Sequence, residues 1–454
     1  MIFTYFFILD IIIVERSDLM KYYCIGIKGT GMSTLAQILS DLGNEVSGYD
    51  DARGHKFTQD GLESRNIPIY YDHDHDIDKD TIVTYSVAFS FDHPEMKRVK
   101  ELGLTIKKYN EIMGDVIDLF ETIGVSGTHG KTTTSSLVRH ILESKMECNY
   151  FIGAGDGHAT KENKYFVVES DEFNRHFTAY HPVYSIITNI EAEHLECYKD
   201  IDDIRNTFEI FANQTKNLVV ANGDNEEVRK INYKTPVKYY GFKDDNDIVI
   251  KNMELLESGS SFDLYIDDSL FGHFDIPLFG EHMVMDAAAA IAITKELGFN
   301  KDEIEDALQT FHNAKRRFAV EEYNGSVIID DYAHHPTEIE VTLKAIRQKY
   351  PNKKLVVVFV PNTYSRTKDF TNEFVDAFNI ADKAYLTEID CNREDPNDYP
   401  GITSHTIIDK LNNGDIISTD TIDKLKDNKD DVVCFMGCAY VDGLINAYKD
   451  LLNK

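Results

Sequence analysis

The chain has 454 residues, too many for one hydrophobic core, which predicts about two to four domains. Its 78 acidic and 47 basic residues give a formal net charge of -31, so most of the surface repels nucleic acid backbones and anionic lipid. We therefore expect a soluble, multidomain protein with no nucleic acid partner and no stable membrane insertion, in which any phosphate ligand binds at a local site.

The cysteines and the N-terminal segment predict a cytoplasmic protein. None of the six cysteines forms a C-x-x-C pair, which fits reduced thiols. The apolar run from Ile2 to Val14 is interrupted by Asp10 and is shorter than the roughly 20 residues that span a bilayer. It also lacks the basic start and the small-residue cleavage site of an export signal. Because Met20 stands directly before a clean strand pattern, we interpret residues 1–19 as a mis-assigned extension.

Residues 20–116 begin with a strand, a glycine turn, a helix and a second strand, and further short strands alternate with helices. This order predicts a parallel, doubly wound, Rossmann-like sheet. The turn GIKGTGM and Asp50 at the end of the second strand come close to a dinucleotide fingerprint, although Thr34 replaces the third glycine. A nucleotide diphosphate, of which NAD is one candidate, fits this turn. The alternative is a turn that only closes the corner between strand and helix.

Residues 117–313 repeat the order of strand, turn and helix. The turn carries the loop GTHGKTTT, which lacks the first glycine of a standard phosphate loop. Gly127 and Gly130 allow backbone amides to turn inward. Lys131 can reach terminal phosphates, and Thr132 can place a hydroxyl on Mg²⁺. A purely structural turn is the weaker alternative, because a buried lysine at a helix start is costly without an anion.

Two acidic clusters follow the next two apolar strands of this block. The first contains Glu169, Asp171 and Glu172, and the second contains Glu191, Glu193 and His194. Parallel strands would deliver both clusters to the sheet edge that carries the loop. Since Mg²⁺ prefers oxygen ligands, Glu169 is a stronger candidate than a histidine on chemistry alone. A solvated acidic loop is the alternative for either cluster alone.

The second block ends with a β-rich segment over 235–277 and a helix over 285–297, and residues 314–454 form a third α/β block. We expect three domains: Rossmann-like, then a P-loop ATPase-like parallel sheet with a β-rich segment, then Rossmann-like again. The third block opens with KRRF, whose arginines could neutralise phosphate charge during transfer. Its first strand ends in DDYAHHP. A surface charge pair and a capped turn are the alternatives for these two motifs.

The motifs in this order resemble the Mur ligases, over residue 20 to about residue 452. They are GIKGTGMSTLAQ, GTHGKTTT, ESDE, TNIEAEH, KRRF and DDYAHHPTEI. The resemblance implies an ATP- and Mg²⁺-dependent ligase of peptidoglycan synthesis, hence of cell wall biogenesis, cell shape and cell division. Within the family, the pattern is most similar to the enzymes that join L-alanine to the lactoyl carboxylate of UDP-N-acetylmuramic acid through an acyl phosphate. UDP thereby replaces NAD as the ligand expected in the first domain.

The resemblance also implies a role for individual residues. Contacts to the UDP substrate are implied for Gly29, Thr30, Gly31, Met32, Asp50 and Ser86. Contacts to ATP are implied for Gly127, Thr128, His129, Gly130, Lys131, Thr132, Thr133, His282, Asp286, Arg317 and Asp331. The metal positions are Thr132, Glu169 and His194; the catalytic residues are Lys131, His194, Arg317 and Asp331; and His334 and Arg366 lie on the amino-acid side.

Several positions depart from the family pattern. Met283 and Asp286 stand where asparagines are common, and Asp286 as a carboxylate accepts hydrogen bonds but cannot donate them. Val360 and Asn362 replace a usual glutamine and histidine, and residues 437–440 read Gly-Cys-Ala-Tyr in place of a G-A-G-D/N turn. A β-carbon at residue 439 restricts a turn that glycine leaves free. These changes bear on ATP affinity and on the choice of amino acid more than on the phosphate chemistry.

Three alternative functions stay open from the sequence. A related ligase with another amino acid or peptide substrate shares the chemistry, and a weakened nucleotide-binding paralogue is consistent with the departures in the third domain. An NAD-dependent oxidoreductase would leave Lys131 and the two acidic clusters without a role. As partners we expect only small-molecule substrates, which are UDP-N-acetylmuramic acid, L-alanine and ATP, and we expect a monomer or a homodimer.

Overall fold

The computed structural model describes residues 19–153, 155–194, 197–391, 394–438 and 441–453. The backbone divides into one unit that comprises residues up to 116 with 155–162, and a second unit that comprises 117–153 and 163 onwards. Nearly all of the segment that we interpret as a mis-assigned extension lies outside the described residues, as do Ala439 and Tyr440. Along the described ranges, no helix is both long and apolar enough to cross a membrane.

The first unit contains a parallel sheet with the strand order β3-β2-β1-β4-β5. Its strands are β1 (Lys21–Ile25), β2 (Glu45–Tyr49), β3 (Ile69–Tyr70), β4 (Ile82–Tyr85) and β5 (Thr105–Lys108), and the short β8 (Asp156–His158) also belongs to this unit but not to this sheet. Its helices are α1 (Thr30–Asp41), α2 (Gln59–Glu63), α3 (Pro94–Glu101) and α4 (Tyr109–Ile117). α1 buries Leu35, Ile38 and Leu39, as the apolar spacing predicts. The expected Rossmann-like order is confirmed.

The second unit begins with a sheet in which β12-β11-β10-β6-β9-β7 run parallel. These strands are β6 (Glu121–Ser126), β7 (Asn149–Ile152), β9 (Tyr165–Glu169), β10 (Tyr184–Ile187), β11 (Leu218–Asn222) and β12 (Val237–Gly241). Next to β12 lie β13 (Ile248–Leu256), β14 (Gly259–Ile266) and β15 (Ser269–Ile276), joined as an antiparallel meander. The β-rich segment expected over 235–277 is therefore confirmed.

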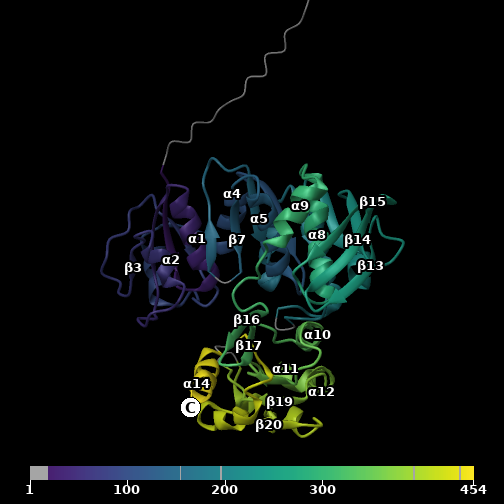
Figure 1. The fold of residues 1–454 in the computed structure, drawn as a ribbon. Coiled ribbons are helices and arrows are strands. Elements are labelled where there is room, and N and C mark those ends of the chain that lie inside the picture. The colour runs from purple at the N-terminus through teal and green to yellow at the C-terminus, as the bar shows by residue number, and fades with distance from the viewer. Residues whose placement is uncertain (1–18, 154, 195–196, 392–393, 439–440, 454) are drawn as a thin grey trace, which may run out of the picture. The chain divides into compact units, whose positions relative to one another are not determined.

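Helices pack on this sheet through small and branched apolar side chains. They are α5 (Lys131–Glu143), α6 (Ile201–Gln214), α7 (Glu226–Arg229), α8 (Glu281–Glu296), α9 (Lys301–Gln309) and the 3-10 helix η1 (Phe173–Ala179). The four buried alanines Ala287 to Ala290 present little bulk on α8, so α5 packs closely against it. Figure 1 shows α5, α8 and α9 grouped beside the strands. The helix expected over 285–297 is confirmed, with an earlier start.

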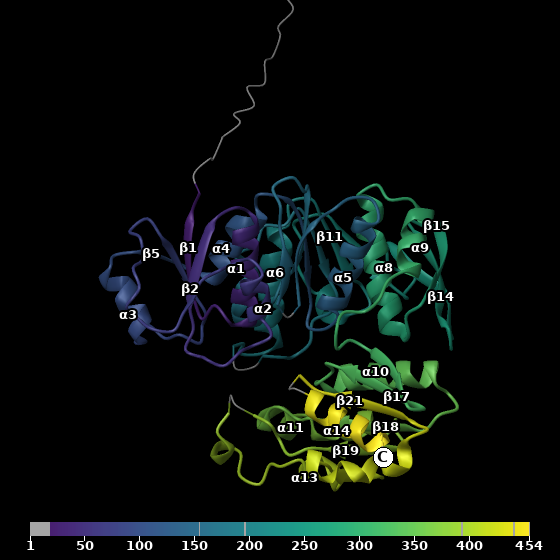
Figure 2. The same cartoon turned by 60° about the vertical axis from the view of Figure 1, so that its left-hand side comes forward.

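The third sheet has the order β16-β17-β21-β18-β19-β20, parallel except for β16. Its strands are β16 (Ala319–Tyr323), β17 (Ser326–Asp331), β18 (Leu355–Phe359), β19 (Lys383–Leu386), β20 (Gly414–Ile416) and β21 (Val432–Met436). Its helices are α10 (Pro336–Lys349), α11 (Tyr364–Asp369), α12 (Thr371–Phe378), α13 (His405–Ile408), α14 (Asp442–Leu452), and the 3-10 helices η2 (Pro396–Asp398) and η3 (Thr419–Asn428). Separate apolar clusters cover its two faces, and Figure 2 shows α14 lying over the strands. This is the expected doubly wound block.

The strand order positions the candidate site. β6 lies between β9 and β10, with Val125 paired to Glu169 on one side and to Ile186 on the other. All three strands are parallel, so the loop after β6 and the acidic clusters after β9 and β10 emerge at the same edge of the sheet. The shared edge expected from the sequence is thus present.

Candidate active site

The loop between β6 and α5 depends on two glycines. Gly127 has φ +149 and Gly130 has φ +82, conformations that residues with a β-carbon rarely adopt. A β-carbon at Gly127 would lie 1.8 Å from the Thr188 Oγ1, and one at Gly130 would lie 2.7 Å from the Asp286 Oδ1. The amide of His129 donates to the Asn189 Oδ1 at 2.9 Å, which ties the loop to the segment after β10. The shortened loop is therefore held closely by its surroundings.

Lys131 starts α5 and is paired with an acid. Its Nζ donates to both carboxylate oxygens of Glu172, at 2.8 and 3.0 Å, and to the carbonyl of Gly127 at 2.5 Å. The Lys131 side chain is 13% exposed and that of Glu172 is 4% exposed. Burial lowers the pKa of Lys131, but the charges of Glu172 and Asp171 outweigh it and hold the pKa above its usual value. Lys131 is therefore a buried cation at the start of a helix, where an anion is favoured.

Thr132 and Glu169 meet beside this pair. The Thr132 hydroxyl donates to the Glu169 carboxylate at 3.0 Å, and the amide of Gly153 donates to the same carboxylate at 2.7 Å. A hydroxyl and a carboxylate at one point are oxygen donors of the kind that Mg²⁺ binds. The residue types that the resemblance implied for the metal therefore fit that ion at Thr132 and Glu169.

His194 reaches the same region from the segment after β10. Its Nε2 lies 3.8 Å from the Glu172 Oε1, and its ring meets the Phe173 ring edge to face at 5.1 Å. The backbone of His194 has φ +56, which is uncommon for a residue with a side chain. The structure thus brings His194 to the Lys131–Glu172 pair through a strained backbone position, as is frequent at functional sites.

Arg317 and Asp331 meet at the start of the third domain. The Asp331 carboxylate is buried and accepts the amides of Phe318 at 2.7 Å and Ala333 at 2.8 Å. Burial raises the pKa of Asp331 to about 6, against the opposing charge of Arg317. The Arg317 guanidinium also lies over the Tyr332 ring, 4.8 Å from its centroid. Asp331 thus shapes the backbone around KRRF, and Arg317 supplies positive charge beside it.

The two arginines of KRRF have different contacts. Arg316 donates to the carbonyl of Gly437 at 2.5 Å and lies 3.3 Å from the Asp330 carboxylate. It therefore anchors the start of the turn in which the sequence departs from the family pattern. Cys438 follows within the described residues, whereas Ala439 and Tyr440, and with them the strain expected at Ala439, lie outside them.

The first turns of α8 carry the other departures near the loop. Met283 is buried in the apolar core, so its exchange for an asparagine is a matter of packing. Burial raises the pKa of Asp286 to about 7, against the charge of Arg317. Burial also lowers the pKa of the nearby His282 to about 4. With a pKa of about 7, Asp286 is partly protonated near neutral pH, and in that form it can also donate a hydrogen bond.

The two residues expected on the amino-acid side both pair with acids. Arg366 donates to Glu193 at 2.8 Å and to the Asn362 Oδ1 at 2.9 Å, and the Nδ1 of His334 lies 3.0 Å from the Glu338 Oε2. Burial tends to raise the pKa of Glu193, but the charges of His334, His129 and Arg366 hold it at about 2. The departure at Asn362 therefore supplies a hydrogen-bond partner to Arg366.

Glu338 links the loop to α10 and is a residue that the sequence reasoning missed. Its Oε1 lies 3.2 Å from the Nδ1 of His129, and its Oε2 accepts the amides of His334 and His335 at 3.0 and 3.2 Å. The signal that could have found it is the capping box at the start of α10, with His335 as N-cap and Glu338 three residues on. That signal predicts the cap but not the contact with His129.

The residues expected to bind the UDP substrate lie in the first unit. Gly29 is the N-cap of α1, which begins at Thr30 and, in the described structure, has no side-chain cap, so its first amides are available to a ligand. Gly31 lies in the same turn. Ser86 lies just beyond β4, and its amide donates to the carbonyl of Ile25 at 2.9 Å. Met32 is buried, so its side chain is not exposed to a ligand.

Asp50 has a different role in the turn from the one that its position suggests. Its two carboxylate oxygens accept the amides of Lys28 and Ala52, each at 2.9 Å. The buried Nζ of Lys28, missed in the sequence, donates to the carbonyls of Ala52 and Gly54, each at 2.6 Å. Asp50 therefore first stabilises the glycine turn, and only its remaining lone pairs are available to a ribose.

Comparison with known proteins decides the family. Three family models match the chain: "Mur ligase family, catalytic domain" over residues 21–121, "Mur ligase middle domain" over 125–294, and "Mur ligase, glutamate ligase domain" over 315–439. The UDP-N-acetylmuramate--L-alanine ligase of Ligilactobacillus salivarius is 43% identical over 434 residues, which are 95% of this chain and 97% of that protein. The chain belongs to the Mur ligase family. The resemblance seen in the sequence is confirmed.

Solved structures of Mur ligases share the fold. The UDP-N-acetylmuramate-alanine ligase of Thermotoga maritima has a TM-score of 0.77 at 24% identity and covers 96% of this chain and 98% of its own. A murein peptide ligase of Psychrobacter arcticus has a TM-score of 0.67 at 20% identity, with coverage of 96% and 99%. These likenesses confirm the three-domain α/β fold class; the domain boundaries after residues 116 and 313 remain predictions.

The buried pair of Lys131 and Glu172 leads to a stability prediction for this Mur ligase. Lys131→Met leaves the Glu172 carboxylate buried without its cation, so we expect the free energy of unfolding to fall by about 3 kcal/mol. The double variant Lys131→Met/Glu172→Gln removes the uncompensated charge and should recover most of that loss. Urea unfolding of the three proteins measures both effects. An equal loss of unfolding free energy in the single and double variants would show that the loss does not come from the unpaired charge of Glu172.

The raised pKa of Asp286 predicts that the stability of the fold depends on pH. Its pKa rises from 3.8 to about 7 on folding, so the folded protein binds the extra proton and the contribution of Asp286 to stability is lost as the pH rises through that window. We expect Asp286→Asn to become more stable relative to the unchanged protein between about pH 5 and pH 8, by about 3 kcal/mol. Thermal unfolding of both proteins across this range measures the difference. A difference that does not change with pH would exclude an elevated pKa.

Proposed function

We propose that this Mur ligase joins L-alanine to the lactoyl carboxylate of UDP-N-acetylmuramic acid, with cleavage of ATP to ADP and phosphate, as a step of peptidoglycan precursor synthesis. The observation that carries the proposal is the 43% identity, over nearly the whole of both chains, to a protein named for this reaction. The convergence of Lys131, Thr132 and Glu169 at one sheet edge supports the ATP-dependent chemistry. We expect the enzyme in the cytoplasm, as a monomer or homodimer without nucleic acid.

The first step requires positive charge. The substrate carboxylate attacks the γ-phosphorus of ATP, the bond to the β-phosphate oxygen breaks, and an acyl phosphate and ADP result. Both reacting groups are anionic, so the main tasks of the protein are to neutralise charge and to position the reactants. Lys131 is desolvated, charged and held at the loop by Glu172, and it can exchange that carboxylate for phosphate oxygens. Arg317, beside Asp331, adds charge from the third domain.

The second step places the amino acid. Its amino group, once deprotonated, attacks the acyl carbon, and phosphate leaves from a tetrahedral intermediate. We assign Arg366 and His334 to the amino-acid side, where Arg366 is oriented by Glu193 and Asn362. A guanidinium held in this way is suited to a carboxylate ligand. A ligase for a different amino acid is the second candidate, favoured by Asn362 in a position where the family commonly has histidine.

We infer that Mg²⁺ is the metal and that Thr132, Glu169 and His194 hold it. The hydroxyl and the carboxylate lie 3.0 Å apart and offer oxygen donors, which this ion prefers over nitrogen. When bound, Mg²⁺ would neutralise charge on the phosphate oxygens. His194, at the Lys131–Glu172 pair, is the nitrogen donor of the set.

The proposal predicts phosphate release that depends on all the substrates. Purified protein with ATP, Mg²⁺, UDP-N-acetylmuramic acid and L-alanine should release phosphate, and Lys131→Met/Glu172→Gln should not, although it is expected to fold. A panel of amino acids in the same assay should show a preference for L-alanine. Preference for another amino acid would support the second candidate. ATP binding without turnover on any of them would favour a weakened paralogue and reject the proposal.

The metal assignment predicts a change in the Mg²⁺ requirement. Glu169→Gln keeps the shape and one acceptor oxygen but loses the charge, so the half-saturating Mg²⁺ concentration should rise on the order of ten- to a hundredfold. Asp171→Asn, an exposed acid of the same cluster, is the matched control and should leave that concentration unchanged. Initial rates at graded Mg²⁺ measure both. Equal effects of the two substitutions would show that Glu169 acts only as one of several nearby charges and does not bind the metal.

A further inference from the structure

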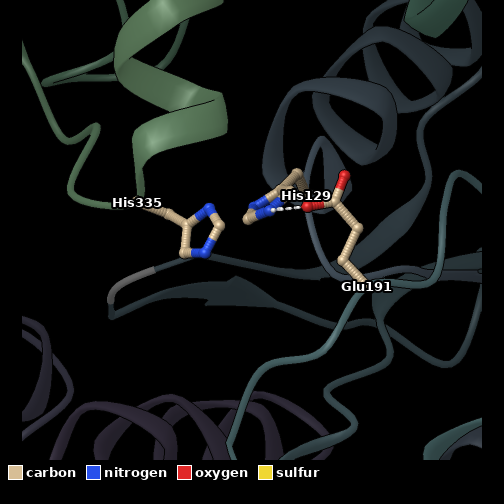
Figure 3. A group of neighbouring side chains, drawn as sticks. All are labelled: His129, Glu191 and His335. Carbon is tan, nitrogen blue, oxygen red and sulfur yellow. Dashed lines mark ion pairs between the residues drawn. The ribbon is translucent and has the colours of Figure 1, made fainter. Parts of the chain in front are cut away.

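Three side chains from separate segments of the second unit point towards one another. His129 comes from the phosphate loop, Glu191 from the segment after β10, and His335 from the N-cap of α10. Figure 3 shows His129 between the ring of His335 and the carboxylate of Glu191. One possible ligand atom from each residue lies within 4.8 Å of the other two. Apart from the ATP contact that the resemblance implies for His129, the proposed reaction assigns no role to these residues.

Two imidazole nitrogens in this group are buried without a hydrogen bond. Within the described residues, the Nε2 of His335 has no hydrogen-bond partner, and the Nε2 of His129 has only an ion pair with the Glu191 Oε2 at 3.4 Å. The His129 side chain is 12% exposed, and His335 is 5% exposed. Buried polar atoms nearly always have a partner, so the unsatisfied Nε2 of His335 beside the His129–Glu191 pair needs an explanation. A bound ion that takes the lone pair of His335 and the place of the proton between His129 and Glu191 would provide it.

The surrounding side chains orient the donors as in a metal site. The Nδ1 of His129 lies 3.2 Å from the Glu338 carboxylate, which fixes the ring and leaves its Nε2 to face Glu191. A carboxylate behind a histidine is the usual support for a metal-binding imidazole. The Thr337 hydroxyl donates to the Oε2 of Glu191 at 3.2 Å and fixes the third donor. Two of the donors are therefore already held in place.

The spacing of two of the donors matches a small tetrahedral site. With bonds of about 2.0–2.1 Å, neighbouring ligand atoms around a tetrahedral zinc ion lie about 3.4 Å apart. The His129 Nε2 and the Glu191 Oε2 are 3.4 Å apart. We propose that His129, Glu191 and His335 form a binding site for a zinc-class divalent cation that joins the phosphate loop to the first turn of α10.

The donor set selects the kind of ion. Two imidazoles and one carboxylate suit Zn²⁺ or Co²⁺, whereas Mg²⁺ prefers oxygen ligands and keeps its waters. The site therefore differs in chemistry from that of Thr132 and Glu169. An anion between the two rings is disfavoured, because the Glu191 carboxylate faces the same space. Three protein ligands also leave a position for water or another ligand.

Binding requires two local changes. The cation takes the place of the proton that His129 shares with Glu191. At His335, coordination through Nε2 puts the ring proton on Nδ1 and gives up the hydrogen bond from the Thr337 amide, which at 3.4 Å is long. The donors lie within 4.8 Å of one another and the two rings are packed at 5.2 Å, so the remaining change is a closing of the side chains around the ion.

The experiment measures the binding of Zn²⁺ to the full chain in the presence of excess Mg²⁺. Equilibrium dialysis gives the affinity, thermal unfolding gives the stabilisation, and the visible spectrum of Co²⁺ reports tetrahedral coordination. The variants are His335→Ala and the nearly isosteric Glu191→Gln, with circular dichroism as a test of folding. The matched control is His55→Ala, because His55, Asp60 and Glu63 form an exposed group of similar donors.

We expect a single ion to bind tightly, to raise the unfolding temperature and to give a tetrahedral Co²⁺ spectrum. Affinity should fall on the order of ten- to a hundredfold in His335→Ala and Glu191→Gln and stay unchanged in His55→Ala. No binding by the unchanged protein, or equal affinity in His335→Ala, would overturn the proposal. These readouts do not depend on ligase activity, so the proposed reaction and this site can fail separately.

Discussion

The ion pair between Lys131 and Glu172 is the interaction on which the site depends. A lysine binds phosphate more strongly when it is removed from water, yet a buried cation without a partner destabilises the fold. Glu172 resolves this conflict, since it lies 2.8 Å from the Lys131 Nζ and is buried with it. Its position depends on the strand order, which sets β9 beside β6 and so brings the acid after one strand to the loop after the other. The strand order therefore also determines which charges meet at the site.

The same constraint extends into the third domain. Glu338 and Arg366 meet His129 and Glu193 across the second unit, and each pair joins a charge of the loop edge to a charge on α10 or α11. These contacts are largely buried, where an unpaired member would be costly. The third domain therefore does more than supply Arg317: its charges complete pairs that the central domain would otherwise leave open. Through His129, the phosphate loop is paired with an acid of each domain, Glu191 and Glu338.

Much of the fold and part of the site followed from the sequence, because strands, glycine turns and capping residues are local signals. The strand-loop-helix around Lys131 and the shared edge with Glu169 are examples. What failed to follow depends on tertiary contacts. The sequence places Asp50 for a ribose but does not show that it also accepts the amides of Lys28 and Ala52. It predicts Glu338 as a cap but not its contact with His129, about two hundred residues earlier.

The departures from the family pattern become less severe in the structure. A carboxylic acid with a pKa of about 7 is partly protonated at neutral pH, and in that form Asp286 has one donor and one acceptor, much like the asparagine that is common there. Burial beside Gly130 outweighs the opposing effects of Thr134 and Arg317 and produces this likeness. Met283 packs into the core, and Asn362 orients Arg366. Each exchange thus keeps a packing or hydrogen-bonding role, which argues for a working ligase over a decayed one.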